Sequence, residues 1–365
     1  MSHCLEPSPD RLPAALNEYR LLGRSGLRVS PLCLGAMTFG TEWGWGADRD
    51  TCRAMFDRYA EQGGNFIDTA DFYTEGTSER MIGDFTKADR AHFIIGTKYS
   101  LKTRDGDPNQ AGNHRANMVR SVEASLKRLE TDYIDLYWLH AWDFTTPVDE
   151  VMRGLDDLVR SGKVIYIAIS DTPAWKIAQL NTFAECNVLS RFIATQGHYN
   201  LIKRDVERDI LPACRELGVG VMPWAPLGGG VLTGKYGRDD LEREKKLLES
   251  GQAKPFGEKN RFVGLTEQKL HVAGVVRDVA EEIGATPSQV ALRWLLTRRG
   301  VTSVILGVRS VKQLDDNVGC LSITLSESHL DRLDEASRFS PGFPHDFLAS
   351  DFVRRMVTGD AAVLD

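Results

Sequence analysis

Four side chains that could move and tune a proton follow apolar runs of this sequence. They are Asp68 in NFIDTA, Tyr73 five residues later, Lys98 in FIIGTK and His140 in YIDLYWLH. A lysine beside a tyrosine can lower the pKa of the phenol, an aspartate can keep that lysine charged, and a histidine can orient a carbonyl oxygen. The set therefore predicts a proton donor that acts while a carbonyl group is reduced.

Each of these residues also has a plainer interpretation. Asp68 could cap a helix, and Lys98 could end a strand in solvent. A single histidine at a strand end is more often structural than catalytic. The four gain weight together, provided that the fold places them around one site.

Composition limits the class of protein. The chain has 365 residues, 42% of them hydrophobic, enough for two ordinary domains or one large α/β barrel. A net charge of -6 and a pI near 5.8 argue against binding to nucleic acid or to an acidic membrane surface. The six cysteines form no CxxC pair, which argues against a metal site or a disulfide framework. With no signal-like start and no apolar run of roughly 20 residues, we expect a cytoplasmic protein.

A strand-then-helix unit recurs along the sequence. After a short hairpin, YRLLGRSGLRVS, come eight runs typical of strands, namely PLCLGAM, GNFIDTA, HFIIGTK, YIDLYWLH, VIYIAIS, RFIATQ, VGVMPW and TSVILG. Continuous apolar runs of this kind are expected for parallel strands that are buried on both faces. The segments between them show helical spacing, as in Met118, Val122, Leu126 and Leu129, which predicts helices that cover a sheet.

Eight such units favour an α/β fold, the (β/α)8 TIM barrel. The alternative is a doubly wound sheet with a GxGxxG turn, but GAMTFGTEWGWG after the first run has the wrong spacing. We expect an arm over 1–18, one barrel domain over 19–340 and a tail over 341–365 that covers the barrel mouth. Within the domain, the long connection 225–265 is expected to be a lid or disordered, and an extra helix is expected from about Glu327.

The barrel gives the polar residues a common place. In such barrels the active site forms at the carboxyl ends of the strands, where the following loops meet. Seven residues lie at or just past those ends, at Asp68, Lys98, His140, Ser170, Gln196, Trp224 and Gly307. We therefore expect them to surround one mouth.

Three ordered segments resemble the signatures of the aldo-keto reductase family, and the resemblance runs from Tyr19 to Phe339. GNFIDTADFY resembles the first signature, DYIDLYWLH the second and VILGVRSVKQLDDN the third. The hairpin is similar to the plug that closes the barrel bottom in that family. HAWD after the fourth strand and GFPHDFL in the tail resemble the aryl-alcohol-dehydrogenase-like bacterial and fungal members.

The resemblance implies a role for each of the four residues. Tyr73 would give its proton to a carbonyl oxygen while hydride reaches the carbon. Lys98 would stabilise the phenolate, and Asp68 would fix Lys98. His140 would hold the substrate carbonyl in place. The hydride would come from a nicotinamide cofactor.

Cofactor contacts follow from the same resemblance. Ser170 and Gln196 resemble the pair that holds the nicotinamide carboxamide, a group that needs both a donor and an acceptor. Trp224 matches the aromatic side chain that stacks on the nicotinamide ring. Ala225 stands where the family often has serine, so a backbone amide would replace a hydroxyl. Further contacts are implied at Met37, Asp68, Asp171, Pro226, Leu227, Gly228, Gly229, Gly230, Lys235 and Arg261.

The adenosine end bears on the choice of cofactor. Arg309 and Ser310 lie where the family grips a 2′-phosphate, and a guanidinium there favours NADPH over NADH. NADP(H) is therefore the predicted cofactor. Ser310 could equally cap a helix and leave Arg309 solvated. The other residues implied at this end are Gly307, Gln313, Asp316 and Asn317.

Aromatic side chains could form a substrate wall. Trp43 and Trp142 follow the first and fourth runs, and the tail carries Phe343, Phe347 and Phe352. Such walls suit aryl aldehydes but also bind sugars, and simple packing between loops would use the same residues. We expect a small-molecule carbonyl substrate of open class, and the sequence is compatible with a monomer or a homo-oligomer.

Two other functions stay open. The chain could be an NADP-binding regulatory subunit, as in relatives that regulate channels, although those lack the histidine present here as His140. It could also oxidise aryl alcohols or sugars, because Tyr73 would be an acid in one direction and a base in the other.

Overall fold

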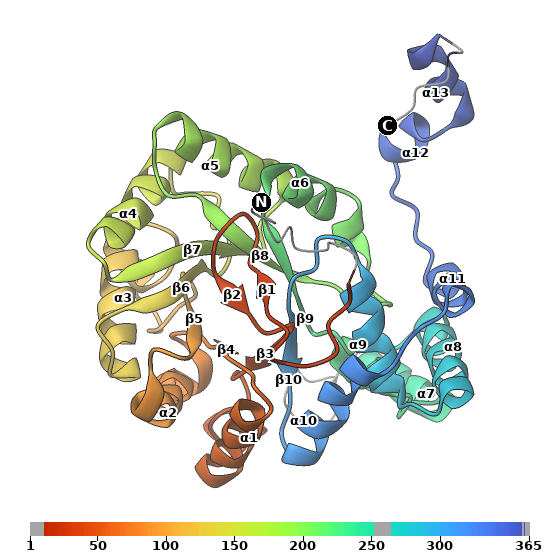
Figure 1. Cartoon of the computed structure of the whole chain (residues 1–365), viewed down its shortest axis with the longest axis horizontal. Helices are drawn as coiled ribbons and strands as arrows, with labels where there is room; N and C mark the ends of the chain where they lie inside the picture. The colour runs from red at the N-terminus through yellow and green to blue at the C-terminus, as the bar shows by residue number, and fades with distance from the viewer. Residues whose placement is uncertain (1–10, 252–263, 360, 362–365) are drawn as a thin grey trace, which may run out of the picture.

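Parallel strands alternate with helices along the described chain, which comprises residues 11–251, 264–359 and 361 of a computed structural model (Figure 1). The barrel wall has the strand order β10-β3-β4-β5-β6-β7-β8-β9, all neighbours parallel. An isolated parallel bridge between Val221 of β9 and Val301, just before β10, brings the two outermost strands together. The strands are β3 (Leu32–Gly35), β4 (Phe66–Asp68), β5 (Ile94–Tyr99), β6 (Ile134–Leu139), β7 (Val164–Ser170), β8 (Phe192–His198), β9 (Gly220–Trp224) and β10 (Val304–Gly307). The predicted TIM barrel is confirmed.

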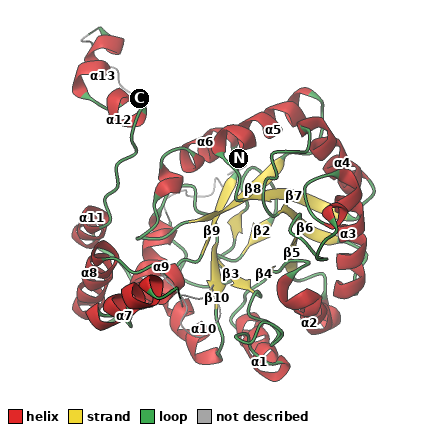
Figure 2. Cartoon of the chain, turned by 180° about the vertical axis from the view of Figure 1, so that it is seen from behind, coloured by secondary structure: helices red, strands yellow, loops and turns green. Residues whose placement is uncertain are grey.

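Helices ring the wall on its outside (Figure 2). In α3, Met118, Val122 and Leu129 are buried, so the predicted apolar face does cover the sheet. The helices are α1 (Arg49–Glu61), α2 (Thr77–Thr86), α3 (Arg115–Leu129), α4 (Val148–Arg160), α5 (Ala174–Cys186), α6 (Ile210–Leu217), α7 (Arg238–Glu249), α8 (Glu267–Ile283), α9 (Pro287–Thr297), α10 (Val311–Val318), α11 (Glu327–Ala336), α12 (His345–Leu348) and α13 (Asp351–Thr358).

Alternation along the strands decides which side chains enter the barrel. Successive residues of a strand point to opposite faces, so every second residue faces the interior. Leu136 and Trp138 of β6 pack inside with Phe66 of β4, Ala194 of β8 and Met222 of β9. Two residues after Phe66, Trp138, Ala194 and Met222, the side chains that also face inward lie at the mouth of the barrel. They are Asp68, His140, Gln196 and Trp224.

The hairpin of β1 (Arg20–Leu21) and β2 (Arg28–Val29) closes the other end. Leu22 and Val29 are fully buried in the interior cluster. Gly23 makes the tight approach possible, since its φ is +57° and a Cβ there would lie 2.1 Å from the carbonyl oxygen of Ile193. The predicted plug is thus formed by a glycine turn pressed against β8.

The N-terminal segment differs from the sequence expectation, whereas the extra helix expected from about Glu327 is present as α11. In the supposed arm, Leu16 is buried and the Pro13 carbonyl accepts a hydrogen bond from Arg293, so residues 11–18 pack on the barrel. The connection 225–265 contains the helix α7, while 252–263 lie outside the described residues, as do 1–10.

The tail does not cover the mouth as expected. After α11 the chain runs outward, and α12 and α13 stand beside the barrel (Figures 1 and 2). Phe343, Phe347 and Phe352 are 85%, 53% and 63% exposed. Phe343 and Phe347 contact each other instead of the mouth, and His345 Nε2 lies 2.8 Å from Asp209 Oδ1, so α12 contacts the start of α6.

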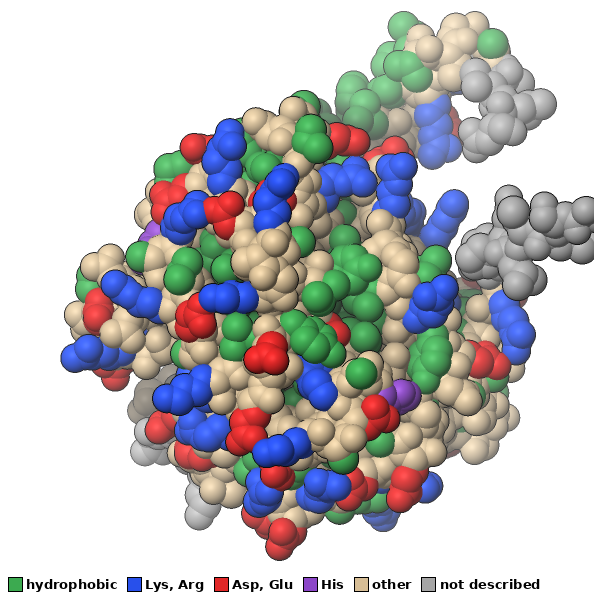
Figure 3. All heavy atoms as spheres, turned by 60° about the vertical axis from the view of Figure 1, so that its left-hand side comes forward, with side chains coloured by type: hydrophobic (Ala, Val, Ile, Leu, Met, Phe, Trp, Pro, Cys, Tyr) green, Lys and Arg blue, Asp and Glu red, His purple; other side chains and the backbone are tan. Residues whose placement is uncertain are grey.

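Surface charge is mixed on the face over α2 to α5, where basic and acidic side chains alternate (Figure 3). None of the described helices combines the length and apolarity that crossing a membrane requires. Among the described residues, no three His, Cys, Asp or Glu side chains are grouped to hold a metal ion.

Candidate active site

Lys98 is the centre of the mouth. Its ammonium lies 2.5 Å from Asp68 Oδ2, 2.7 Å from the carbonyl oxygen of Thr69 and 3.2 Å from Tyr73 Oη. Lys98 and Asp68 are 1% and 3% exposed, so the ion pair is formed out of water. Because the ammonium donates to the phenol oxygen, the phenol proton of Tyr73 is directed elsewhere.

The charges of this group follow from burial and from one another. Burial lowers the pKa of Lys98, but the attraction of Asp68 and Tyr73 outweighs it and the net pKa is raised. Burial raises the pKa of Tyr73, and Lys98 offsets this only in part, contrary to the expected lowering. At neutral pH the group therefore contains an ammonium ion and an un-ionised phenol.

Tyr73 stands on a turn of unusual backbone shape. It opens a short 3-10 turn, η1 (Tyr73–Gly76), in which Thr74 and Glu75 have φ values of +45° and +57°. Hydrogen bonds hold this strained backbone, since Thr74 Oγ1 donates to the Phe39 carbonyl at 2.6 Å. The Asp71 amide also donates to the Lys98 carbonyl at 3.1 Å, which ties the turn to β5.

His140 faces Tyr73 across the mouth. The two rings are 5.9 Å apart in an edge-on arrangement. Burial lowers the pKa of His140 far below its ordinary value and Lys98 lowers it further, so the imidazole is neutral. Its Nδ1 is buried and has no hydrogen-bond partner within the described chain.

Aromatic rings form one wall around Tyr73 and His140. Trp43, a predicted substrate residue, contacts Tyr73 at 6.2 Å between ring centroids. Phe72, which the sequence reasoning missed, lies 5.2 Å from Tyr73 and 5.7 Å from His140. Its position between Asp68 and Tyr73 was the available signal. The other predicted substrate residue, Trp142, is 7% exposed with a buried, unpartnered Nε1 among described residues.

The predicted amide-binding pair sits on neighbouring strands. Ser170 and Gln196 are register partners on β7 and β8, and both are buried. Gln196 Nε2 donates to Asp68 Oδ1 at 2.6 Å, so its carbonyl oxygen remains as an acceptor. This orientation suits a carboxamide N–H, while the Ser170 hydroxyl can serve the carboxamide oxygen.

Trp224 is held at two sides. Its Nε1 donates to Asp171 Oδ1 at 3.0 Å, and Asp171 adopts a φ of +41° to reach it. The ring of His198 is stacked on the indole with centroids 4.2 Å apart and planes 16° apart. The sequence reasoning did not identify His198 as a site residue. It lies two residues after Gln196 on β8, so both side chains point to the same face of the strand.

The loop after β9 is shaped by backbone that favours glycine. Ala225, Gly228, Gly229 and Gly230 all have φ between +49° and +91°. A Cβ on Gly228 would lie 2.6 Å from Ile202 Cδ1, and one on Gly230 would lie 2.8 Å from Lys235 Nζ. The bare backbone and the nearby ammonium fit the predicted pyrophosphate site. Pro226 and Leu227 lead into its 3-10 turn, η5 (Gly228–Thr233), whereas Arg261 lies outside the described residues and Met37, just after β3, has no contact here that tests its role.

The adenosine end is arranged around α10. Ser310 caps this helix by accepting the Gln313 amide, and Gln313 in turn accepts the Arg309 amide at 2.9 Å. Arg309 and Gly307 are exposed, which leaves the guanidinium accessible to a phosphate. Asp316 accepts a hydrogen bond from Gln289, and Asn317 is a buried residue of α10 itself.

Comparison with known proteins shows the family of the chain. The model of the aldo/keto reductase family matches residues 31–338. A norsolorinic acid reductase of Aspergillus flavus is 39% identical over 353 residues, which cover 94% of this chain and 87% of that protein. An aryl-alcohol dehydrogenase [NADP(+)] of Phanerodontia chrysosporium is 36% identical over 355 residues, 93% of this chain and 90% of that protein.

Proposed function

Because the chain belongs to the aldo/keto reductase family, we propose that it uses NADPH to reduce an aldehyde or ketone to an alcohol, with Tyr73 as the general acid. The observation that carries this proposal is the buried ammonium of Lys98, fixed between Asp68 at 2.5 Å and the phenol of Tyr73 at 3.2 Å. A charge placed there stabilises the phenolate that remains after the proton leaves.

His140, Phe72 and Trp43 have different proposed roles in the mouth. A buried N–H without an acceptor is costly, so we assign the proton of His140 to Nε2 and leave the unpartnered Nδ1 as an acceptor. Nε2 then donates to the substrate carbonyl and aligns it with the Tyr73 hydroxyl. Phe72 and Trp43 exclude water from one side of that carbonyl.

The cofactor would supply hydride to the carbonyl carbon. Ser170 and Gln196 would hold its carboxamide, Trp224 would support its ring and the loop 225–230 would take its pyrophosphate. Arg309 at the start of α10 supports NADPH over NADH, because an exposed guanidinium can bind a 2′-phosphate with two hydrogen bonds. The NADP(+) in the name of the Phanerodontia chrysosporium relative favours the same choice.

The proposed substrate is a small carbonyl compound. Aryl aldehydes are the preferred candidates, because aromatic rings form one wall of the mouth. The relatives named for norsolorinic acid and aryl alcohols support an aromatic substrate. A cytoplasmic location remains part of this proposal, as does the absence of a nucleic-acid partner.

The test is a panel of aryl aldehydes, aliphatic aldehydes, keto-sugars and steroid ketones, followed by NADPH absorbance in the protein and in Tyr73→Phe. Turnover of at least one carbonyl class that is lost in Tyr73→Phe supports the proposal. Tight NADPH binding without turnover of any class would favour a regulatory subunit instead. Equal turnover by both proteins would remove Tyr73 as the acid.

A further inference from the structure

A second hollow opens beside Trp224, outside the group around Lys98. It has a volume of about 540 Å³ and lies between the loop after β8, the loop after β9, the first turns of α8 and the end of α11. A volume of this size is in the range of small-molecule sites. None of Asp68, Tyr73, Lys98 and His140 lines it.

Strand order separates this hollow from the adenosine end. The wall runs β8-β9-β10, so the loop after β9 has the β8 loop on one side and the β10 loop on the other. The hollow lies on the β8 side, with Lys203 and Ile202 in its lining. Arg309 and α10 follow β10, on the opposite side. The hollow borders the proposed cofactor site at Trp224, Ala225, Gly228 and Gly229, but its part between His198 and Lys269 lies away from the adenosine end.

Two ammonium groups give the hollow a positive potential. Burial lowers the pKa of His198 to about 4, and the charges of Lys203 and Lys269 lower it further. Burial also lowers the pKa of Lys269, with Glu244 offsetting this in part. Lys269 donates at 2.5 Å to the carbonyl of Gly264, a neutral acceptor, and Glu244 offsets the cost of its buried charge only in part, so an anion in the hollow would stabilise the ammonium further.

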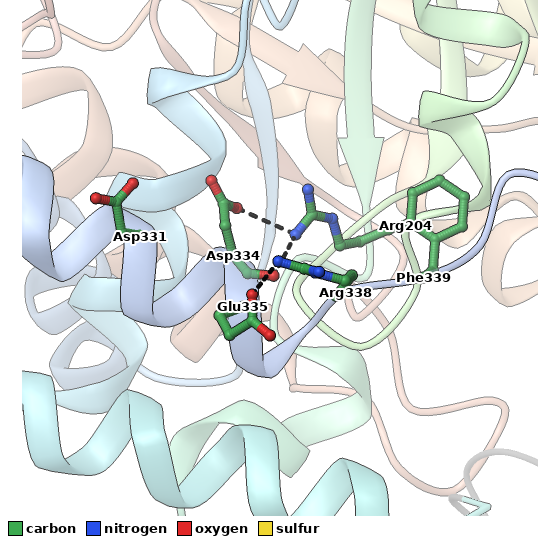
Figure 4. A pocket seen from close by; sticks show the side chains of 6 residues that line it. All are labelled: Arg204, Asp331, Asp334, Glu335, Arg338 and Phe339. Carbon is green, nitrogen blue, oxygen red and sulfur yellow. Dashed lines mark hydrogen bonds and ion pairs between the residues drawn. The ribbon is translucent and has the colours of Figure 1, made fainter. Parts of the chain in front are cut away.

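The other cations of the lining are already paired. At the far end, Arg204 Nη1 lies 3.1 Å from Asp334 Oδ1 and Arg338 pairs with Glu335 (Figure 4). Lys203 lies 2.8 Å from Asp205 but is half exposed, so its ammonium can reach a second partner. An incoming anion would thus meet Lys203 and Lys269 near His198, rather than the arginines.

The floor of the hollow is aromatic and apolar. The imidazole of His198 is neutral and lies parallel to Trp224 at 4.2 Å, which presents a planar stack to a further ring. Ile202 and Val272 add aliphatic surface beside it. A ligand that fits both the aromatic floor and the two ammonium groups has an aromatic ring and one negative charge.

We propose that this hollow is a binding site for a small aromatic carboxylate, whose ring packs beside the stacked His198 and Trp224 and whose carboxylate lies between Lys203 and Lys269. Binding there does not depend on the proposed reductase function. The coupling does, because Trp224 is also the proposed support of the nicotinamide ring. A ligand that fixes Trp224 changes the affinity for NADPH, and NADPH changes the ligand's affinity by the same factor.

The test uses benzoate as the probe, with benzamide as its uncharged counterpart, and titration calorimetry on the full-length protein without cofactor. We expect benzoate to bind with a Kd of about 1 mM or tighter and benzamide to bind at least about tenfold more weakly. Lys203→Gln and Lys269→Gln should each weaken the binding of benzoate by about threefold to tenfold. The exposed Lys127→Gln on α3 is the matched control and should change nothing.

Tyr73→Phe and His140→Asn distinguish this hollow from the mouth. Benzoate binding that persists in both variants supports the proposal, whatever their activity. Loss of binding in these two variants, or unchanged binding in Lys203→Gln and Lys269→Gln, would overturn it. No measurable binding of benzoate up to about 10 mM would overturn it as well. Circular dichroism of each variant checks that the fold is retained, and His198→Phe, which keeps the stack, should still bind benzoate.

Discussion

Asp71→Asn should stabilise the fold, although Asp71 lies beside the turn that carries Tyr73. Asp71 is 3% exposed, and neither of its carboxyl oxygens has a hydrogen-bond partner within the described chain. Glu79, fully buried, is nearby and is occupied by Thr97 and Arg128. Burial and then the charge of Glu79 raise the pKa of Asp71 from 3.8 to about 8, despite the attraction of Arg128.

The sign and size of the effect follow from that pKa. The folded protein keeps a proton on Asp71 that the unfolded chain releases above pH 3.8. The stability associated with this group is therefore complete below pH 3.8 and is lost progressively up to about pH 8. At 1.36 kcal/mol for each pKa unit, the loss at pH 7 is about 4 kcal/mol. Asparagine resembles the protonated acid and has no such loss.

Urea unfolding of the protein and of Asp71→Asn between pH 5 and pH 8 measures this difference. We expect the variant to be more stable at pH 7 by up to about 4 kcal/mol, with a gap that narrows steadily toward pH 5. Asp143→Asn is the contrasting control: burial raises the pKa of Asp143, but hydrogen bonds from the Asn113 and Thr146 amides outweigh it and the net pKa is lowered, so its amide variant should be less stable at pH 7. An Asp71→Asn variant with the same pH slope as the unchanged protein would refute the assignment of a neutral buried carboxyl.

Three further variants test other parts of the structure. Arg309→Ala should weaken the binding of NADPH by about 10- to 100-fold and change the binding of NADH little, as measured by fluorescence titration. Equal weakening of both cofactors would mean that another residue binds the 2′-phosphate. His140→Ala should lower kcat/KM by about 100-fold or more with unchanged NADPH affinity, and a loss confined to cofactor affinity would contradict its role. Gly23→Ala should destabilise the fold by more than about 1 kcal/mol in urea unfolding, because its φ is +57° and Ile193 leaves no room for a Cβ. An unchanged midpoint there would mean that the hairpin does not press on β8.

The barrel and its mouth were accessible from the sequence because two simple rules decide them. Strands covered by helices read as nearly continuous apolar runs, and the predicted run VIYIAIS has the same bounds as β7, Val164–Ser170. Residues at the ends of such strands share one rim, and this placed Asp68, Lys98 and His140 together.

Properties that depend on three-dimensional neighbours could not be read in this way. The rise in the pKa of Tyr73 reflects burial, which the sequence does not show, so the nearby lysine alone suggested the opposite direction. The stack of His198 on Trp224 depends on the register between β8 and β9, which pairs these two residues. The prediction that the tail covers the mouth was based on its aromatic side chains. In the structure, Phe343 and Phe347 contact each other instead.

The most direct test of the proposed chemistry is single-turnover reduction by Tyr73→Phe with NADPH already bound. Removing the hydroxyl leaves the ring contacts with Phe72 and His140 in place, so cofactor affinity should stay within about twofold. Stopped-flow measurement of NADPH oxidation with an aryl aldehyde should then show a rate at least about 100-fold lower than that of the unchanged protein. A rate within about tenfold of the unchanged protein would show that another group protonates the carbonyl.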